Sequence, residues 1–583
     1  MPIPGGKFLI DQINPADIFT PEDFSEEHQM VANTVADFVE NEVVPNIERL
    51  DHQEEGLMAA TLKKAGELGL LGADIAEEYE GADMGKIASA IIAEYSSGGG
   101  SFAVSIGAHT GIGSLPIVLF GTEEQKKKYL PGLATGELIA AYALTEPGAG
   151  SDALNSKTKA VLSEDGKYYI LNGEKIFITN AGFADVFIVY AKVDGDKFTA
   201  FIVDRDTPGF SVGAEEKKLG IKGSSTCSLI FEDAKVPVEN VLGEVGKGHV
   251  IAFNILNIGR YKLGAGCVGS SKVALNQAVK YALERQQFNL PLAKFGMIRT
   301  KIAQMAVKTY AAESAVYRLV GDIEEALHDV KSGAEAGAAI EEYAIECSIT
   351  KVLGSETLDY CVDECVQIHG GYGYTQEFPA ERFYRDARIN RIFEGTNEIN
   401  RLVIPATLLR KAMKGKLPLM QAAQALSNDI LNLRATVEED GKPLAAERAM
   451  INMAKKLFLL VGGQAVQKFM QKLAKEQEMI AIMADMAIQI YAMESAVLRA
   501  LKAWEKDPAS AETKLLLASA YVYDVFPMFD KWAKEALCYL FEGDMLRTQL
   551  SIVKRMLKFP PTNLVELRRQ IAAKVIDAEK YVV

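Results

Sequence analysis

The spacing of apolar residues changes twice along the chain. From residue 25 to about 135, apolar residues recur at three and four positions, as in "MVANTVADFVENEVVPNIERL", which is the pattern of amphipathic helices. From about 140 to 245 the pattern becomes that of short strands, and beyond about 250 the helical period returns and continues to the C-terminus. Helices and strands grouped in this way predict an α+β fold, not a series of βαβ units.

The same changes in pattern predict domain boundaries. We expect an N-terminal helical domain over residues 25–139, a small central β domain over 140–246, a helical domain over 247–412 and an additional helical domain over 413–583. A chain of 583 residues is long enough to fold as several domains.

Turn and helix-end signals add local predictions. Asn172-Gly173 in "KYYILNGEKIFITN" and Asp194-Gly195 each predict a β-hairpin turn, because both dipeptides readily adopt the positive φ angles that tight hairpins need. The segment "TEEQKKKYLPGL" predicts a helix that begins at its acidic end and stops before Pro131.

Composition is typical of a soluble globular protein and excludes some functions. Hydrophobic residues make up 49% of the chain and charged residues 24%. The formal net charge is −15 and no basic stripe stands out, so nucleic-acid binding is not expected, and an anionic small molecule would need a local basic pocket. The sequence has no signal-peptide pattern and no run of about 18 uncharged apolar residues. We therefore expect a cytoplasmic protein.

The cysteines predict neither a disulfide framework nor a metal site. Six cysteines are scattered along the chain, and only Cys361 and Cys365 lie close, at a helical i, i+4 spacing without a second pair. We expect reduced cysteines that pack as small hydrophobic residues in a reducing compartment.

The segment "GAGCVG", residues 264–269, matches the dinucleotide-binding pattern G-x-G-x-x-G. That site needs a strand directly before the glycines and a helix directly after them. The preceding residues, "FNILNIGRYKL", continue one long helical pattern instead. We therefore expect these glycines to permit close helix packing.

Further segments combine glycine with polar or aromatic residues. "ALTEPGAGSD" (143–152) leaves backbone amides open to a ligand, although a plain turn fits equally well. In "KIFITNAG", Phe177 is either a core aromatic or the flank of a flat cofactor. "ERQQF" puts Arg285 at a helix end, and "QIHGGYGY" (367–374) offers backbone amides to a phosphate, whereas an arginine at a helix end is usually a solvated charge.

The segment "RIFEGTNEINR" raises the main question about chemistry. Helical signals stop near Arg391 and resume near Asn397, which places Glu394 at a chain reversal just before a helix. The carboxylate there is a solvated loop charge, a charge of the first helical turn or a buried base. Phe393 would shield it from water and raise its pKa, and Thr396 is suited to cap the following helix.

Taken together, these segments resemble the acyl-CoA dehydrogenase family. "YALTEPGAGSD", "IFITNAGFAD", "ERQQF", "QIHGGYGY" and "ERFYRDARINRIFEGTNEI" occur in the order and spacing of that family, and the resemblance runs from about residue 25 to 410. It implies a four-helix bundle over 247–412. The helical block after 415 resembles the very-long-chain branch, whose members carry an additional C-terminal domain.

The resemblance implies an FAD enzyme that converts an acyl-CoA to a trans-2-enoyl-CoA in fatty acid β-oxidation. Glu394 would take the α-proton while flavin N5 accepts the β-hydride. The backbone N–H of residue 394, with a flavin ribityl hydroxyl, would hold the thioester carbonyl and stabilise enolate charge. Some members carry the base at the position of Gly259, and because glycine cannot serve, the sequence favours Glu394.

The resemblance also assigns binding residues. It implies FAD contacts for Tyr142, Leu144, Thr145, Gly150, Ser151, Phe177, Ile178, Thr179, Thr396, Asn397 and Glu398. It implies FAD contacts across a subunit interface for Arg285, Phe288, Phe295, Gln367, Ile368, Gly370 and Gly371. It implies substrate contacts for Ser151, Asn257, Arg260, Phe393 and Gly395. Many members have tryptophan in place of Phe177, so we expect the shielding of the flavin to differ here.

Acyl chain length and partners follow less directly from these residues. If "SIGAHTGIGS" (105–114) lines the acyl tunnel, as the resemblance implies, its small residues favour long over medium chains, whereas close helix packing is the alternative. The expected partners are acyl-CoA, an electron-transfer flavoprotein and a second copy of the chain. The amphipathic segment "AERAMINMAKKLFLLVGGQAVQKFMQKLAKE" predicts either packing on the dimer or contact with a membrane surface.

Two rival functions use the same fold. An acyl-CoA oxidase would keep the base but let oxygen reach the reduced flavin, and a scaffold would act by interaction with catalysis secondary. Short- or medium-chain specificity is the rival within the dehydrogenase interpretation. Retention of Glu394, Arg260 and the glycine-containing loops argues against a scaffold.

Overall fold

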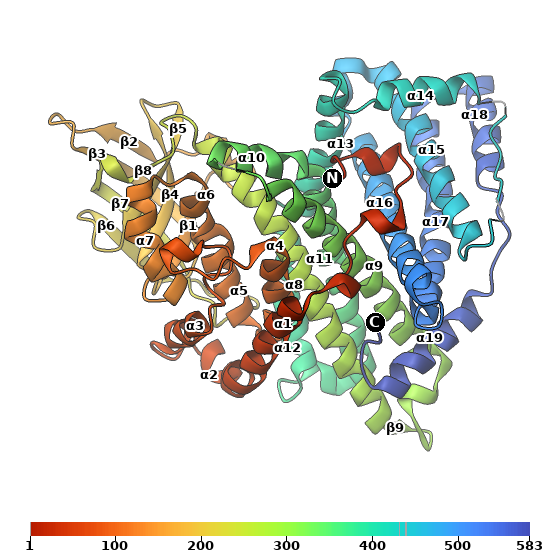
Figure 1. Ribbon diagram of the computed structural model, residues 1–583, viewed down its shortest axis with the longest axis horizontal. Coiled ribbons are helices and arrows are strands. Elements are labelled where there is room, and N and C mark those ends of the chain that lie inside the picture. Colours follow the sequence, from red (N-terminus) through yellow and green to blue (C-terminus); the bar gives the residue numbers. More distant parts are fainter. Residues whose placement is uncertain (1, 331, 431, 438–439) are drawn as a thin grey trace.

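The computed structural model describes residues 2–330, 332–430, 432–437 and 440–583. Figure 1 shows a sheet with flanking helices on one side, a central group of long helices, and a further group of helices from the C-terminal part of the chain. The N-terminal segment runs across the face where the two helical groups meet. The predicted α+β fold with an additional C-terminal helical region is confirmed.

The sheet is built from residues 140–242. Its strands follow the order β6-β7-β3-β2-β4-β5-β8, and β1 pairs with β4. Strands β4 and β5 are almost entirely buried, which matches their continuous apolar runs. The strands are β1 Ala140–Ala143, β2 Lys159–Leu162, β3 Tyr168–Thr179, β4 Val186–Val193, β5 Lys197–Asp204, β6 Phe210–Glu215, β7 Thr226–Pro237 and β8 Val241–Leu242.

The hairpin predicted at Asp194-Gly195 is confirmed. Val193 at the end of β4 pairs with Lys197 at the start of β5. Both turn residues have positive φ angles, 53° for Asp194 and 87° for Gly195, as a tight hairpin requires.

The hairpin predicted at Asn172-Gly173 is wrong. Both residues lie inside the continuous strand β3, at a bulge where its register against β7 shifts. The Asn172 side chain bonds Asp233 of β7 instead of closing a turn: its Nδ2 donates to Asp233 Oδ1 at 3.0 Å, and its Oδ1 accepts from Asp233 N at 2.9 Å. A Cβ on Gly173 would lie 2.6 Å from Thr158 Oγ1, so the glycine permits a close backbone approach.

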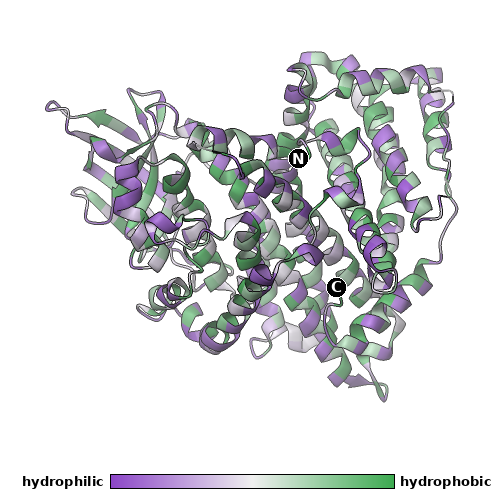
Figure 2. Ribbon diagram, in the orientation of Figure 1, coloured by the Kyte–Doolittle hydropathy of each residue, from purple (hydrophilic) through white to green (hydrophobic). Residues whose placement is uncertain are grey.

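Short helices form the N-terminal region beside the sheet. The charged residues on the outward side of α7 give it the hydrophilic colour seen in Figure 2. The helices are α1 Glu26–Phe38, α2 Ile47–Asp51, α3 Leu57–Glu67, α4 Gly85–Tyr95, α5 Ser101–Gly107, α6 Leu115–Phe120 and α7 Glu123–Thr135.

The helix end predicted before Pro131 is wrong. Helix α7 continues through Pro131 to Thr135 and is capped by Gly136, whose φ of 78° is left-handed. A proline inside a helix removes one backbone hydrogen bond. Here the Thr135 hydroxyl donates to Pro131 O at 3.1 Å, which satisfies a carbonyl at the end of the helix. The helix start is confirmed, because Thr122 Oγ1 accepts from Gln125 N at 3.2 Å.

Long helices form the central bundle, with α8 packed closely against α11. A Cβ on Gly354 of α11 would lie 3.1 Å from the Cα of Gly264 in α8, and one on Gly269 would lie 2.0 Å from Glu94 O. The glycines of "GAGCVG" therefore serve helix packing inside α8, and the dinucleotide interpretation is excluded. The elements are α8 Gly248–Glu284, β9 Gln286–Gln287, β10 Leu290–Pro291, α9 Gly296–Leu327, α10 Gly333–Glu342, α11 Ala344–His369, α12 Pro379–Ala387 and α13 Asn397–Met413.

The C-terminal helices pack on this bundle through α16, which contacts α9 and α13, and through α19, which contacts α9. Helix α15 contacts α16 and α17, and residues such as Leu457, Val461 and Ala465 on its apolar face are buried there. The apolar face proposed for membrane contact is thus covered by protein. The helices are α14 Leu419–Asn428, α15 Ala445–Phe469, α16 Gln477–Lys506, α17 Glu512–Leu540, α18 Gly543–Met556 and α19 Leu564–Ala578.

Two segments among the described residues are long and apolar enough to cross a membrane, which corrects the expectation that no such segment exists. They are Ser101–Phe120 and Gln477–Lys506. Of the most apolar 18 residues in each segment, 56% and 78% respectively are buried inside the fold. Core helices of soluble proteins pass the same test, and both segments lie in the packed interior here. All six cysteines are free, and five of them are buried.

A buried ionic cluster joins the central bundle to the additional domain and to the C-terminus. Glu313 of α9 accepts hydrogen bonds from Arg499 Nη1 of α16 at 2.6 Å and from Tyr581 OH at 2.9 Å. Lys272 of α8 pairs with Glu313 and also with Glu94 of α4, at 2.5 Å from the latter. Burial alone would raise the pKa of Glu313, but Arg499 and Lys272 outweigh burial and lower it.

The N-terminal segment is tied to the same cluster. Arg499 Nε donates to Glu22 Oε2 at 2.9 Å. Lys455 Nζ of α15 donates to Asp11 O at 2.7 Å, and Lys502 Nζ of α16 donates to Ile18 O at 2.7 Å. Charged side chains of the additional domain therefore hold the N-terminal segment against the bundle.

We expect Arg499→Met to destabilise the fold by about 3–5 kcal/mol, because removing one partner of a buried ion pair leaves an uncompensated charge. Urea unfolding of the full chain measures the loss. Arg547→Met is the matched control, since Arg547 pairs with Asp544 at the exposed surface and should contribute little. A loss for Arg499→Met no larger than the loss for Arg547→Met would contradict the role given to the cluster.

Candidate active site

Glu394 lies in a tight turn between the end of α12 and the start of α13. Glu394 and Gly395 both adopt left-handed backbone conformations, with φ of 57° and 76°. Helix α13 begins at Asn397, and Thr396 Oγ1 caps it by accepting from Ile399 N at 3.2 Å. The predicted chain reversal at the threshold of a helix is confirmed. A left-handed glutamate is strained, so surrounding groups must hold it.

Three buried side chains hold the carbonyl groups of this turn. Arg260 Nε of α8 donates to Glu394 O at 3.2 Å. Lys351 Nζ of α11 donates to Gly395 O at 2.8 Å. Asn400 Nδ2 donates to Gly395 O at 2.9 Å and to the next carbonyl, Thr396 O, at 3.0 Å. The turn is therefore fixed from two helices of the bundle and from α13 itself.

The Glu394 carboxylate fills space that a glycine on α8 leaves open. A Cβ on Gly259 would lie 2.8 Å from Glu394 Oε2 and 2.9 Å from Oε1, closer than real Cβ contacts allow. Side chains at 259 and 394 therefore compete for one position. This contact gives a physical basis for favouring Glu394 when residue 259 is glycine.

The Glu394 carboxyl has a pKa close to neutral pH. Burial raises the pKa of Glu394 to about 7, although the charges of Arg260 and Lys351 lower it in part. Although the residue as a whole is partly exposed, Oε2 is buried and has no hydrogen-bond partner in the protein. An unpartnered buried carboxylate with this pKa is suited to accept a proton near neutral pH. Of the three interpretations of Glu394, the buried carboxylate is the one observed.

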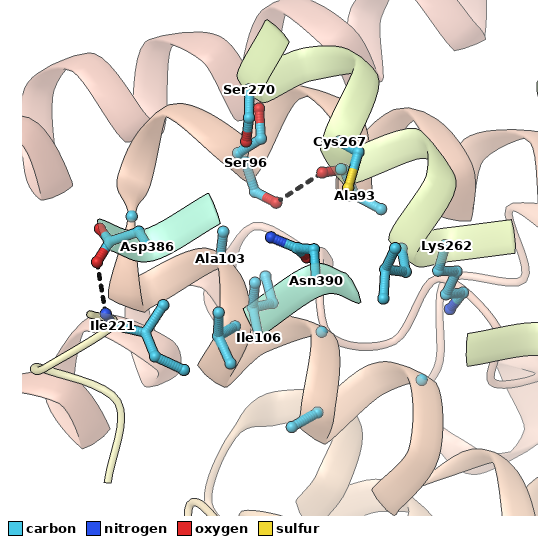
Figure 3. Close-up of a pocket in the computed structure, with 18 of the residues that line it drawn as sticks. Ala93, Ser96, Ala103, Ile106, Ile221, Lys262, Cys267, Ser270, Asp386 and Asn390 are labelled. Carbon is cyan, nitrogen blue, oxygen red and sulfur yellow. Dashed lines mark hydrogen bonds between the residues drawn. The ribbon is translucent and has the colours of Figure 1, made fainter. Parts of the chain in front are cut away.

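A cavity of about 210 Å³ opens beside Glu394. Along α8 its wall includes residues from Gly259 to Val273, a distance of fourteen residues or about 21 Å at the helical rise. Figure 3 shows Lys262, Cys267 and Ser270 of α8 on this wall, with residues of α4, α5 and α12 around the same space. The residues between 105 and 114 that line it are Ile106, Gly107, Ala108, Thr110, Gly111 and Ile112.

The cavity wall is mostly apolar but carries a second carboxylate. Asp386 Oδ1 accepts from Ile221 N, as Figure 3 shows, so one of its oxygens has a structural partner. Burial raises the pKa of Asp386 to about 6. Asp386 is therefore the alternative base that any assignment of Glu394 has to exclude.

The first group of predicted FAD residues comes together at the ends of β1 and β3. Ile176 N donates to Thr145 O at 2.9 Å, which joins the loop after β1 to β3. Thr179 lines the same cavity as Glu394. Phe177 is 60% exposed with a φ of 59°, so it is not a core aromatic. Tyr142 OH is buried without a partner, and Leu144 and Ile178 are buried beside it, whereas Gly150 and Ser151 are exposed.

The second group lies at the opposite end of α8. Arg285 follows the last residue of that helix, 26 residues and therefore about 39 Å from Gly259. Its guanidinium lies over the Tyr372 ring at 5.5 Å, and Phe288, which is 86% exposed, meets Phe295 at 6.2 Å. Gln367 and Ile368 lie in the last turn of α11, and Gly370 and Gly371 follow its last residue, His369. One chain therefore does not bring the two groups into one site.

Thr396, Asn397 and Glu398 form the start of α13, next to Glu394. The Asn397 side chain is already engaged, because its Oδ1 accepts from Lys351 Nζ at 2.7 Å and its Nδ2 donates to Ser355 Oγ at 3.1 Å. Glu398 is exposed. Only the backbone of Asn397 is left to meet a cofactor.

The predicted substrate pair is adjacent but buried. Arg260 Nη1 donates to Asn257 Oδ1 at 2.9 Å, and both residues are almost fully buried. The Arg260 guanidinium also faces the carbonyl of Glu394, so it supports the turn as well as supplying a local cation. Phe393 lines the cavity, and Gly395 completes the left-handed turn.

Sequence reasoning missed two residues of the site, Lys351 and Asn400. Lys351 stands in "AIECSITKVLGSETL", a run whose other positions are mostly apolar or small. A single lysine in such a run could have been recognised in the sequence as a candidate site residue. Asn400 lies one turn into α13 and carries no signal of its own, because its role comes only from how the turn folds back over it.

Comparison with known proteins identifies the family. Models of the acyl-CoA dehydrogenase N-terminal domain, middle domain and C-terminal domain match residues 25–137, 141–234 and 246–409, and a further acyl-CoA dehydrogenase C-terminal domain matches 453–555. The chain therefore belongs to the acyl-CoA dehydrogenase family of oxidoreductases, and it carries the additional C-terminal domain. The resemblance found in the sequence is confirmed.

Individual relatives agree with this assignment. The "Probable acyl-CoA dehydrogenase" of Bacillus subtilis (strain 168) is 54% identical over 99% of this chain and 98% of its own length. The mitochondrial very long-chain specific acyl-CoA dehydrogenase of Bos taurus is 37% identical over 88% of this chain and 80% of its own. The crystal structure of an acyl-CoA dehydrogenase complexed with FAD from Bacillus anthracis matches with a TM-score of 0.98 and 55% identity, covering both chains completely.

The raised pKa of Glu394 predicts a pH-dependent effect on stability. The folded-state pKa of about 7 lies above the ordinary value of 4.5, so the stability that Glu394 contributes is complete below pH 4.5 and is lost as pH rises through 7. We expect Glu394→Gln to be more stable than wild type at pH 8, by at most about 3 kcal/mol, with the difference shrinking toward pH 5. Thermal unfolding of both proteins across this range tests the shift, and parallel stability curves would exclude it.

Proposed function

We propose that this protein is an FAD-dependent dehydrogenase of long-chain acyl-CoA, which forms trans-2-enoyl-CoA in fatty acid β-oxidation and passes electrons to an electron-transfer flavoprotein. The observation that carries the proposal is the Glu394 carboxylate beside a long apolar cavity, with its Oε2 buried and without a hydrogen-bond partner. Membership of the acyl-CoA dehydrogenase family supports the reaction class.

Glu394 is the base that removes a proton from the α-carbon of the acyl thioester. Its pKa near 7 keeps a large fraction ionised at neutral pH while leaving it basic enough to accept a carbon-bound proton. The backbone N–H of residue 394 donates to the thioester carbonyl and stabilises the enolate charge that develops there. The fixed turn supports both roles, because it holds the backbone and the carboxylate of one residue together.

The chain's residues fit FAD, which supplies the hydride acceptor when bound. The exposed Phe177 provides an aromatic flank, and Cβ atoms added at Gly148 and Gly150 would meet nothing within 4 Å, so this loop leaves open space for a ligand. Thr179 shares the cavity with Glu394. These residues would hold the end of the cofactor that faces the substrate.

A second copy of the chain would complete the cofactor site. Arg285 and the residues around it lie about 39 Å from Gly259 along α8, too far to serve the same cofactor within one chain. Two aromatic side chains of this region are almost fully exposed, Phe288 at 86% and Tyr374 at 87%, and exposed aromatic groups of this kind are typical of an interface. A homodimer in which each chain contributes this region to its partner's site accounts for both observations.

The length of the cavity supports a long acyl chain. An extended alkyl chain with C–C bonds of about 1.5 Å advances at most about 1.3 Å per carbon. The wall of about 21 Å along α8 would then accompany roughly 16 carbons. The very long-chain specificity named for the Bos taurus relative agrees with this estimate.

Free cysteines are consistent with a cytoplasmic location.

Glu394→Gln tests the assignment of the base. We expect the variant to bind FAD and acyl-CoA but to lose at least about 1,000-fold in the rate of anaerobic flavin bleaching, because no carboxylate remains to take the α-proton. Stopped-flow absorbance measures that rate. Asp386→Asn is the matched comparison, since Asp386 is also a cavity carboxylate with a raised pKa. Bleaching retained in Glu394→Gln but lost in Asp386→Asn would reassign the base.

Gly266→Leu tests the chain-length proposal. Gly266 lines the cavity about 10 Å along α8 from Gly259, and a Cβ there would make only an ordinary contact, 3.5 Å from Ala93 O. We expect the added side chain to block the far part of the cavity. Bleaching by hexadecanoyl-CoA should fall at least about tenfold while bleaching by butyryl-CoA stays near wild type. Equal effects on both substrates would show that the acyl chain takes another path.

A further inference from the structure

Lys351 is a buried cation in contact with the Glu394–Gly395 turn. It lies in α11 with none of its surface exposed to solvent. Its ammonium donates to Gly395 O at 2.8 Å and to Asn397 Oδ1 at 2.7 Å, both neutral oxygens. Within the described residues, no carboxylate forms an ion pair with it, in contrast to the buried lysines 175, 262 and 455, which pair with acids.

A buried ammonium without a carboxylate partner is costly. Several kcal/mol are needed to take such a charge out of water, and neutral oxygens recover only part of that cost. An apolar residue of similar length would avoid the cost. The position therefore calls for a role that a neutral side chain does not fill.

The charged and titratable groups around Lys351 point to that role. Those that act on it are Cys267 of α8, Glu394 of the turn, Arg260 of α8 and Glu398 at the start of α13. Glu398 is exposed and Cys267 has a raised pKa, so neither supplies a buried negative charge. The buried anion that Lys351 faces is the Glu394 carboxylate, which it shares with Arg260.

The hydrogen bonds of Lys351 also fix the backbone that carries Glu394. Glu394 and Gly395 are consecutive left-handed residues, and such a pair persists only when its surroundings hold it. Lys351 holds the second carbonyl of the pair and also Asn397, the first residue of α13. One ammonium thus joins the strained turn to the helix that follows it.

We infer that Lys351 is a positioning residue of the dehydrogenation: its ammonium fixes the Glu394–Gly395 turn and supplies positive charge that favours the ionised form of the base. This inference rests on the proposed function, because it acts through Glu394. It explains why a cation is retained at a buried position that offers it no acid of its own.

The expected effect has a definite sign. The pKa of Glu394 is raised by burial, then lowered by Arg260 and Lys351, so removing Lys351 moves it further upward. Burial lowers the pKa of Lys351 itself to about 8. Above pH 8, wild type therefore loses part of the positive charge that Lys351 directs at Glu394, whereas Lys351→Arg stays charged.

The test compares Lys351→Met, Lys351→Gln and Lys351→Arg in the FAD-loaded protein. For each variant, the rate of anaerobic flavin bleaching by hexadecanoyl-CoA is measured from pH 6 to 9. Infrared titration follows the protonated-carboxyl band that Glu394→Gln removes, and reports the pKa of Glu394 without turnover. Lys455→Met is the matched control, because it removes a buried lysine whose ammonium bonds Asp11 O and pairs with Glu494, and not with the turn.

We expect Lys351→Met and Lys351→Gln to shift two curves upward by about one pH unit: the bleaching rate against pH and the infrared titration of Glu394. The rate should then fall about tenfold at pH 6 and recover toward pH 9. Lys351→Arg should keep the wild-type pH dependence between pH 6 and 8, where Lys351 is charged in wild type, even with a lower maximal rate. Lys351→Gln keeps the test open if Lys351→Met fails to fold, since it keeps a donor for Gly395 O. Lys455→Met should lower stability without shifting either profile.

Two results would overturn the inference. One is an unshifted Glu394 titration in both neutral variants, and the other is a rate that falls equally at every pH. Failure of the proposed function is a separate result: wild type would then leave the flavin unbleached, while the infrared titration would still report whether Lys351 acts on Glu394.

Discussion

The contact between the Glu394 carboxylate and Gly259 is the constraint on which the rest of the site depends. A side chain at 259 would occupy the space that the carboxylate fills, so the glutamate can lie against α8 only because that helix has no Cβ there. Burial at this contact raises the pKa of Glu394 to about 7. The same contact places the carboxylate at the cavity wall, and the surrounding chain is arranged to keep it there.

The support for that contact extends through the bundle. Helices α8 and α11 approach closely at Gly264 and Gly354, which lets Arg260 from one helix and Lys351 from the other reach the same turn. Farther along, the cluster around Glu313 joins α8, α9 and α16 through buried charges. The additional domain thus packs on the outside of the helices that hold the base, which gives it a structural role independent of any membrane.

Much of this arrangement could be predicted from the sequence, because apolar periodicity and specific motifs report local environments. The α+β order, the Asp194-Gly195 hairpin and the reversal at Glu394 were predictable. One failure has a tertiary cause, because Asn172 bonds Asp233 of the neighbouring strand. The other is local: α7 continues through Pro131, and its left-handed C-cap comes only at Gly136. Lys351 and Asn400 were missed because their roles depend on carbonyl positions in a left-handed turn, which no local pattern encodes.

The central claim, that Glu394 is the base, is tested most directly by proton exchange without redox chemistry. The FAD-loaded protein would be incubated in D₂O with an acyl-CoA that lacks β-hydrogens, and deuterium at the α-carbon would be followed by mass spectrometry. The wild type should introduce deuterium at that carbon, and Glu394→Gln should not. Equal exchange by both proteins would contradict the assignment, because it would mean that another group removes the α-proton.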